Sequence, residues 1–266
     1  MKRFLLAISV AVACGTFFVL MYMYTRVTLY SRSTPPQISP TPSTIHTVIN
    51  PKQFFDITQD NRSFRIAWFT VQNPDTISLI PNFREQNTSR AALETSHCLD
   101  LVNGGFYTQE KKPTGLFVTH GETEEVFQPN TLLNGIFSIT TQGQVSITSE
   151  PPKESLRIAL QTGPVLFRNG YPQKLRLIED EFARRSVVAT TVTNAVLFFV
   201  LYDRENPYQG PLLSEVPFLL TQWQKQTTQE VRDAINLDGG SASAWYSEGF
   251  FLQELTAVGS YFCVLQ

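Results

Sequence analysis

The stretch Ala234–Ser241, which reads AINLDGGS, is a short apolar run followed by an acid, two glycines and a hydroxyl. The apolar half predicts a buried β-strand that ends in a polar corner. Glycine accepts positive φ angles and lets a ligand approach the backbone N–H groups, which can form an anion-binding concavity. A carboxylate beside such a concavity suits acid–base chemistry. Asp238, with Gly239, Gly240 and Ser241, is therefore the first candidate site.

Three other segments join an apolar strand to a polar corner in the same way. An arginine pair at a strand start suits phosphate, because a guanidinium makes two parallel hydrogen bonds to it. Each corner alone also fits an ordinary turn or a solvated strand edge. Together they indicate a shared site, although their spacing names no reaction. The corners are Asn103-Gly104-Gly105 before Phe106 and Tyr107, Thr162-Gly163 before Pro164, and Arg184-Arg185-Ser186.

The rest of the chain predicts a β-rich α+β fold, a single domain with mixed sheets and few helices. Two segments are expected to be helical: Thr88–Ser96, and Ser214–Lys225 with Ser214 as its N-cap. The expected strands are rich in Val, Ile, Phe and Thr, and turn residues separate several of them. They are Phe64–Val71, Thr76–Ile80, Gly115–Thr119, Ile136–Thr140, Val145–Thr148, Leu156–Gln161, Val165–Arg168, Ser186–Thr191, Ala195–Tyr202 and Tyr261–Leu265.

The N-terminus differs sharply from this domain. Phe4–Tyr24 contains no charged residue, and a helix of that length rises about 1.5 Å per residue, enough to cross a bilayer. Lys2 and Arg3 precede it, so the positive-inside rule places the N-terminus in the cytoplasm. We expect an uncleaved membrane anchor. A cleaved signal peptide and a lipoprotein modified at Cys14 are the alternatives, and all three export the remaining chain.

The predicted organisation is a signal anchor over 1–30, a Ser/Thr/Pro-rich tether over 31–51 and a globular domain over 52–266. The first fifty residues hold four basic and no acidic residues, whereas the remainder holds 17 basic against 23 acidic ones. The net charge of −2 argues against a nucleic-acid-binding surface. Export suggests a membrane-anchored protein whose domain faces the periplasm or the outside.

Export also bears on the cysteines. Cys98 and Cys263 are the two thiols of the domain, and an oxidising compartment makes a disulfide between them plausible; two buried free thiols are the alternative. No zinc-type spacing, HExxH motif, P-loop or nucleophile elbow occurs, so we expect no metal and no cofactor.

In order and residue type, the four corners resemble the motifs of the phosphodiester glycosidase family. The resemblance extends over roughly residues 60 to 266, and Ala234–Gly240 is its most specific part. Three positions depart from the family pattern: Ser186 replaces a threonine, Ala189 a glycine, and Ala242 the usual serine. Ser241 or Ser243 are the candidates to supply the missing hydroxyl.

The resemblance implies a hydrolase that cleaves a sugar-1-phosphate diester at the glycosidic C–O bond, in an envelope or extracellular glycan. It implies Asp238, Arg185 and Asn103 as catalytic residues; whether Asp100 or Glu122 assists stays open. The alternatives are a non-catalytic carbohydrate- or cell-wall-binding module, suggested by Ala242, and an anchored assembly factor. The N–H groups of Gly104, Gly105, Gly239 and Gly240 would hold the departing phosphate together with Arg185. The implied substrate-binding residues are Gly104, Gly105, Thr162, Gly163, Ser186, Gly239, Gly240 and Ser241.

Overall fold

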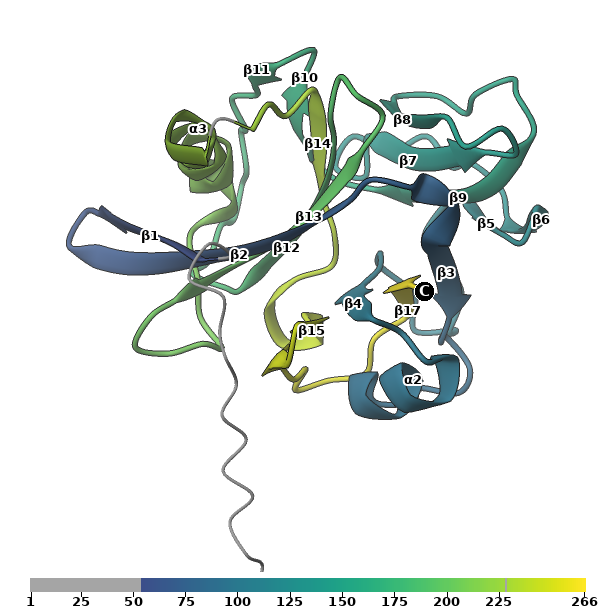
Figure 1. Ribbon diagram of the computed structural model, residues 1–266, viewed down its shortest axis with the longest axis horizontal. Coiled ribbons are helices and arrows are strands. Elements are labelled where there is room, and N and C mark those ends of the chain that lie inside the picture. Colours follow the sequence, from purple (N-terminus) through teal and green to yellow (C-terminus); the bar gives the residue numbers. More distant parts are fainter. Residues whose placement is uncertain (1–53, 228) are drawn as a thin grey trace, which may run out of the picture. The chain divides into compact units, whose positions relative to one another are not determined.

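A computed structural model describes residues 54–227 and 229–266, all of which fall within one compact unit. The described chain forms a β-rich single domain of three sheets and two α-helices (Figure 1). The largest sheet has seven strands, in the order β1 (Phe54–Gln59), β2 (Arg62–Val71), β13 (Val196–Asp203), β12 (Arg185–Thr190), β14 (Asp233–Asn236), β10 (Val165–Arg168) and β11 (Tyr171–Pro172).

The other two sheets have five strands each. One has the order β16 (Phe250–Leu252), β15 (Trp245–Ser247), β4 (Asp100–Asn103), β17 (Ser260–Val264) and β3 (Ile77–Pro81). The other has the order β6 (Glu122–Glu125), β5 (Phe117–Thr119), β9 (Leu156–Thr162), β7 (Gly135–Thr140) and β8 (Val145–Thr148).

Every strand pairing in the described residues is antiparallel, so the prediction of mixed sheets was wrong. Parallel neighbours need crossover connections, which are usually helical, whereas antiparallel neighbours can be joined by tight turns. A chain with so few helices therefore favours antiparallel pairing. Five strands outside the predicted set also form: β1, β6, β11, β15 and β16. Of these, β6 reads ETEE and is an exposed edge strand, where charged side chains are common.

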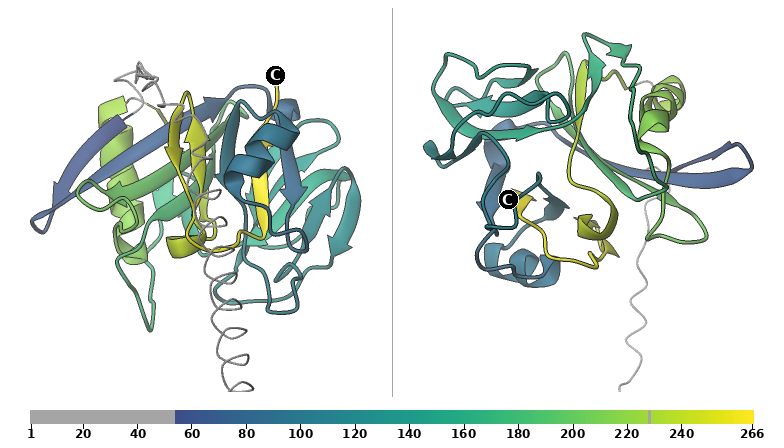
Figure 2. Two further views of the ribbon diagram at one scale, coloured as in Figure 1. Left: turned by 90° about the horizontal axis from the view of Figure 1, so that it is seen from below. Right: turned by 180° about the vertical axis from the view of Figure 1, so that it is seen from behind.

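The central strands of the seven-stranded sheet are buried on both faces, which explains the unbroken apolar run of β13. Leu197, Phe199 and Leu201 face helix α3 (Val216–Thr227), while the alternating residues Val196 and Phe198 face the other two sheets. Figure 2 shows α3 beside the long strands, apart from the teal five-stranded sheet. The domain is thus layered, with one apolar core on each side of its largest sheet.

Both predicted helices form, with one correction at a cap. Helix α2 (Ser89–Ser96) has Thr88 as its N-cap, and the Thr88 side chain accepts a hydrogen bond from Ala91 N. Ser214, by contrast, lies inside the 3₁₀ turn η3 (Leu213–Glu215) that precedes α3, and its N–H donates to Asp180. Glu215 accepts from Leu212 N instead, so the chain enters α3 through a different cap. The remaining 3₁₀ turns are η2 (Pro74–Thr76) and η4 (Gly240–Ala242).

The disulfide between Cys98 and Cys263 is present, with 5.3 Å between the two Cα atoms. It ties the segment before β4 to β17, the neighbouring strand. The predicted anchor and tether lie outside the described residues. Within the described residues, no helix has the length and apolar character needed to cross a membrane.

Candidate functional site

Three of the four predicted corners meet at the end of strand β14. The backbone N–H of Leu237 donates to Ser186 O at 2.9 Å, and that of Asp238 donates to Gly104 O at 3.0 Å. Thr162 also joins the group, because its hydroxyl donates to Asn236 O at 2.8 Å. All four corners are therefore in contact with β14 or the residues that follow it, as the sequence predicts for a shared site.

Asn103 is the hub of this junction. Its Oδ1 accepts from Ser186 Oγ at 2.6 Å and from Ala244 N at 3.1 Å, while its Nδ2 donates to Asp238 O at 2.5 Å and to Gly104 O at 3.2 Å. The side chain is fully buried, and every hydrogen-bonding position is used by the protein. In this structure the Asn103 side chain holds the corner that bears Asp238, and its catalytic role stays a prediction.

Asp238 carries the carboxyl of the corner. Burial raises the pKa of its carboxyl from the ordinary 3.8 to about 7, and the N–H of Gly239, which donates to Oδ1 at 2.9 Å, opposes that shift. The residue is only partly buried, so solvent or a ligand can reach it. It forms no ion pair with any described residue. A carboxyl that titrates near neutrality is suited to proton transfer or nucleophilic attack.

Arg185 lies beside this corner, because its Cδ is 3.8 Å from where a Cβ on Gly239 would project. Its Nε donates to Pro211 O at 3.2 Å, and its Nη2 reaches Glu181 O and, at 3.4 Å, the Asp180 carboxylate. Its Nη1 makes no hydrogen bond within the described part of the chain. Burial lowers the pKa of the guanidinium, which nevertheless stays charged. One guanidinium nitrogen of Arg185, Nη1, is therefore available to an anion.

A cavity of about 400 Å³ opens against Arg185. Leu132 also lines it, and the Leu132 carbonyl oxygen would be 2.2 Å from a Cβ on Gly163, so the cavity borders a second predicted corner. Three acidic residues form part of the wall: Glu179, Asp180 and Glu181. Among the described residues that line the cavity, Arg185 is the one basic residue. Its Nη1, which makes no hydrogen bond within the described chain, is therefore the group of this lining best suited to contact a phosphate oxygen.

Arg184 has a different role from its neighbour. Its guanidinium is buried and donates to three backbone carbonyls, those of Ser243 at 2.5 Å, Gln253 at 2.7 Å and Pro207 at 3.2 Å. Burial lowers the pKa of Arg184 to about 10. The residue joins three loops of the fold, and the paired arginines of the sequence thus divide into one structural and one available side chain.

The glycines of the corners serve packing more than phosphate binding. The N–H groups of Gly104, Gly239 and Gly240 already donate, to Ser260 O at 2.6 Å, to the Asp238 carboxylate and to Arg184 O at 2.7 Å. A Cβ on Gly104 would be 2.2 Å from Ser260 Oγ, and one on Gly105 would be 2.9 Å from Leu160. Side chains are therefore excluded by close neighbours. Three of the four backbone N–H groups that were expected to hold a phosphate are therefore already bonded within the protein.

The corner Thr162-Gly163 is likewise a buried structural element. Asn236 Nδ2 donates to Gly163 O at 3.0 Å, so Asn236 connects this corner to β14. The buried Oδ1 of Asn236 has no hydrogen-bond partner within the described residues. Asn236 is not among the site residues predicted from the sequence, although its position two residues before Asp238 could have indicated it.

The two serines that flank Ala242 lie in different surroundings. Ser243 is buried, and its Oγ lies 2.9 Å from Ser186 Oγ, inside the network of Asn103. Ser241 is exposed and accepts from Thr256 Oγ1 at 3.0 Å, so its hydroxyl is turned to a surface loop. Ser243 therefore belongs to the site, and Ser241 lies at its edge.

Neither proposed second carboxylate joins Asp238. Asp100 begins strand β4 and Asn103 ends it, so the two lie roughly 10 Å apart along the strand. Glu122 is on the exposed edge strand β6 of another sheet. Within the described residues, no group of three or more His, Cys, Asp or Glu side chains has the arrangement of a metal site.

The layered antiparallel fold, the Asp238 carboxyl with its raised pKa, and Arg185, whose stem packs near Gly239, together fit a β-rich hydrolase of the phosphodiester glycosidase type. The chain belongs to the phosphodiester glycosidase family, whose model matches residues 98–264, more than half of its length. This confirms the resemblance inferred from the four corners. A comparison with curated protein sequences finds no match.

Two solved structures share the fold. The zebrafish N-acetylglucosamine-1-phosphodiester alpha-N-acetylglucosaminidase catalytic domain, auto-inhibited by its pro-peptide, matches with a TM-score of 0.59 and 16% identity, over 80% of this chain and 81% of that one. A hypothetical protein from Synechocystis matches with a TM-score of 0.59 and 14% identity, over 79% of this chain and 61% of that one. At these identities the matches establish the fold alone.

Proposed function

We propose that this protein hydrolyses a sugar-1-phosphate diester at the glycosidic C–O bond. The observation that carries the proposal is the partly buried Asp238 carboxyl with a pKa of about 7, in a corner whose next residue, Gly239, lies near the stem of Arg185. Family membership supplies the reaction type, and the name of the zebrafish enzyme indicates a sugar-1-phosphodiester as the bond attacked.

In the proposed reaction, the bond between the anomeric carbon and the phosphate oxygen breaks, and that oxygen leaves with the phosphoryl group as a phosphomonoester. Water supplies the hydroxyl that the anomeric carbon gains. Asp238, in its ionised form, acts on the anomeric centre or on the attacking water, and Arg185 Nη1 binds the departing phosphate. A phosphate is a good leaving group, so one carboxylate suffices without strong general-acid assistance.

The location of the enzyme forms the second part of the proposal: a membrane-anchored domain facing the periplasm or the outside, acting on a glycan there. The uncharged run 4–24 behind Lys2 and Arg3 supports it. The Cys98–Cys263 disulfide supports it as well, because disulfides persist mainly in oxidising compartments.

Hydrolysis in H₂¹⁸O tests the reaction. The substrates are methyl diesters of a panel of aldose 1-phosphates, with N-acetylglucosamine 1-phosphate among them. Cleavage of the C–O bond places ¹⁸O in the released sugar and none in methyl phosphate, which mass spectrometry resolves. Label in methyl phosphate would identify a phosphodiesterase that cleaves the P–O bond, and no turnover on any diester would contradict the proposal.

A non-catalytic carbohydrate-binding module is the second candidate, favoured by Ala242 in place of the family's serine. Ser243 Oγ, inside the buried network, weakens that argument because a hydroxyl is still present. A binding module would retain affinity for the sugar diester while releasing no labelled sugar, so the same experiment separates the two functions.

A further inference from the structure

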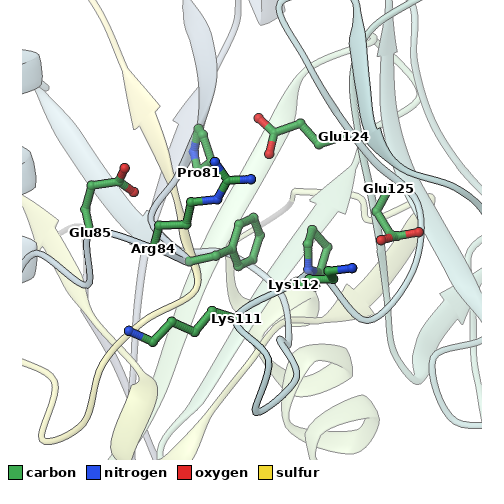
Figure 3. Close-up of a pocket in the computed structure, with 9 residues that line it drawn as sticks. Pro81, Arg84, Glu85, Lys111, Lys112, Glu124 and Glu125 are labelled. Atoms are coloured by element: carbon green, nitrogen blue, oxygen red, sulfur yellow. The ribbon is translucent and has the colours of Figure 1, made fainter.

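A second cleft lies away from Asp238, with a volume of about 560 Å³. That size falls within the range of small-molecule sites. Its charged walls come from three segments: Arg84 and Glu85 follow β3, Lys111 and Lys112 lie in the loop after β4, and Glu124 and Glu125 lie on β6. Figure 3 shows the charged groups of Arg84 and Glu124 turned toward each other across the cleft.

The charges of this cleft are not paired with one another. Arg84, Lys111 and Lys112 form no ion pair within 4.0 Å in the described residues, and neither do the three glutamates. Three cationic and three acidic side chains thus line the cleft without ion pairs, and of the carboxylates Glu125 accepts a hydrogen bond from Val126 N at 3.2 Å. A ligand with an anionic group and several hydroxyls would satisfy both kinds of side chain.

The remaining wall is apolar. Pro81, Phe83 and Pro113 line it, and Phe83 is held by rings below, with centroids 5.0 Å from Phe117 and 6.4 Å from Tyr107. Sugar rings present C–H faces that pack on such surfaces, while their hydroxyls donate to carboxylates. The cationic side chains suit a phosphate. The combination fits a sugar phosphate better than a free anion or a neutral sugar.

The lysines are carried on a braced loop rather than a loose one. Thr108 N donates to Lys112 O at 2.8 Å, Lys111 N donates to Thr108 O at 3.0 Å, and Lys111 has a left-handed φ of 60°. Tyr107, at the base of the loop, forms a β-bridge with Pro113 and donates its hydroxyl to Ala257 O at 2.9 Å. The positions of the two lysine backbones are therefore set by the fold.

The same loop connects the cleft to the Asp238 site. It begins at Gly104, directly after the Asn103 hub, and reaches Lys111 seven positions later. Gly259 also lies between the two sites: a Cβ on it would be 2.7 Å from Tyr107 and 3.0 Å from Phe83, while the next residue, Ser260, accepts from Gly104 N. The floor of the cleft is thus packed against the same strand as the site.

We propose that this cleft binds a second sugar-phosphate unit of the substrate. The natural substrate is then a chain of sugars linked through phosphates, held at one unit by Asp238 and Arg185 and at another by Arg84, Lys111 and Lys112. This inference rests on the proposed function, because it specifies the substrate class of the same site.

The test compares two substrates and two triple variants. One substrate is the methyl diester cleaved best in the panel above, and the other is an oligomer of the same sugar 1-phosphate. The variant Arg84→Ala/Lys111→Ala/Lys112→Ala removes the three cationic side chains of the cleft. The control Lys153→Ala/Lys174→Ala/Arg176→Ala removes three exposed positive charges elsewhere, so the net charge changes equally.

We expect the cleft variant to raise KM for the oligomer by about tenfold or more, with kcat unchanged, because charge-assisted contacts to a non-reacting unit are lost. Its kinetics on the methyl diester should change by less than about twofold. The control variant should match the wild type on both substrates. Equal effects of the two triple variants on the oligomer would overturn the inference.

A binding measurement separates this inference from the proposed function. The probe is the N-acetylglucosamine 1-phosphate oligomer, titrated into Asp238→Asn protein and followed by calorimetry. Weaker binding when the cleft substitutions are added supports the cleft, even if the wild type hydrolyses no diester and the proposed function fails. If the cleft substitutions leave binding unchanged, or if the oligomer does not bind at all, the inference about the cleft is overturned. The hydrolysis experiment then tests the proposed function independently.

Discussion

The junction around Asn103 and the cleft around Arg84 are built on opposite principles. At the junction, buried polar groups bond to one another: Asn103, Ser186 and Ser243 form a closed network. At the cleft, the charged side chains form no ion pairs within the described chain. The motif-rich region therefore mainly holds the fold, and it leaves a carboxylate and one guanidinium N–H available for chemistry. The cleft has no motif but has far more free hydrogen-bonding capacity.

The largest expected effect comes from the carboxylate that the junction positions. Asp238→Asn should lower kcat/KM for the sugar diester by about 10³-fold, the scale expected for loss of a catalytic acid–base group. Circular dichroism should show an unchanged fold, since the isosteric amide still accepts from Gly239 N. A wild-type rate in this variant would remove Asp238 from the mechanism.

The disulfide should make the largest contribution to stability among the features of the junction. Cys263 pairs with Leu101 in the register of β17 and β4, so the crosslink braces the strand that ends in Asn103. Cys98→Ser/Cys263→Ser should reduce the free energy of unfolding by up to about 5 kcal/mol, because the closed loop is long.

Urea denaturation measures that loss. Each single variant should lose as much as the double variant, because either substitution opens the same loop. If dithiothreitol left the urea midpoint of the wild type unchanged, the crosslink would contribute no stability.

Breaking the hub tests the contrast between the two regions most directly. Asn103→Ala leaves Ser186 Oγ and the N–H of Ala244 without an acceptor in a buried site, and should cost about 2–3 kcal/mol in unfolding free energy. Lys111→Ala, in the cleft, should change stability by less than about 0.5 kcal/mol. Chemical denaturation of both variants decides the matter, and equal losses would erase the distinction between the regions.

The pH dependence follows from the pKa of Asp238, about 7 in the folded protein against an ordinary 3.8. Between these values the folded protein holds the proton that the unfolded chain has lost, so the free energy of unfolding falls as pH rises from about 4 to 7 and then levels. Asp238→Asn should remove this component of the slope. Parallel stability curves for wild type and variant across that window would show that the carboxyl is not perturbed.

Activity should depend on the ionisation of Asp238 too, but it should rise with pH where the free energy of unfolding falls. If the ionised carboxylate is the active form, kcat/KM rises with pH through about 7. An activity that falls through this pH would assign Asp238 as a general acid instead.

The smallest expected effect distinguishes the two serines. Ser241→Ala removes an exposed hydroxyl bonded to Thr256 and should change kcat/KM by less than about twofold. Ser243→Ala removes a buried member of the network and should cost about 1 kcal/mol or more in unfolding free energy. A larger kinetic loss from Ser241→Ala would return Ser241 to the centre of the site.

The sequence by itself determined that these corners meet, which residues bound the helix α2, and that Cys98 and Cys263 were candidates to pair. Those features depend on local chemistry, such as the Thr88 cap, the apolar period of α3, or the glycines that admit close neighbours. The resemblance to a family also rests on local residue order, which is why it could be read before the fold.

Tertiary structure alone decided how the corner residues are used. Arg184 and Arg185 are adjacent and chemically identical, yet one is enclosed by three carbonyls while the other borders a cavity. Asn103 is buried by strands distant in sequence, so its hydrogen-bond partners could not be foreseen. The cleft of Arg84, Lys111 and Glu124 combines three segments with no shared motif. Long-range packing determines which polar atoms are satisfied internally, and the atoms left over are those available to a substrate.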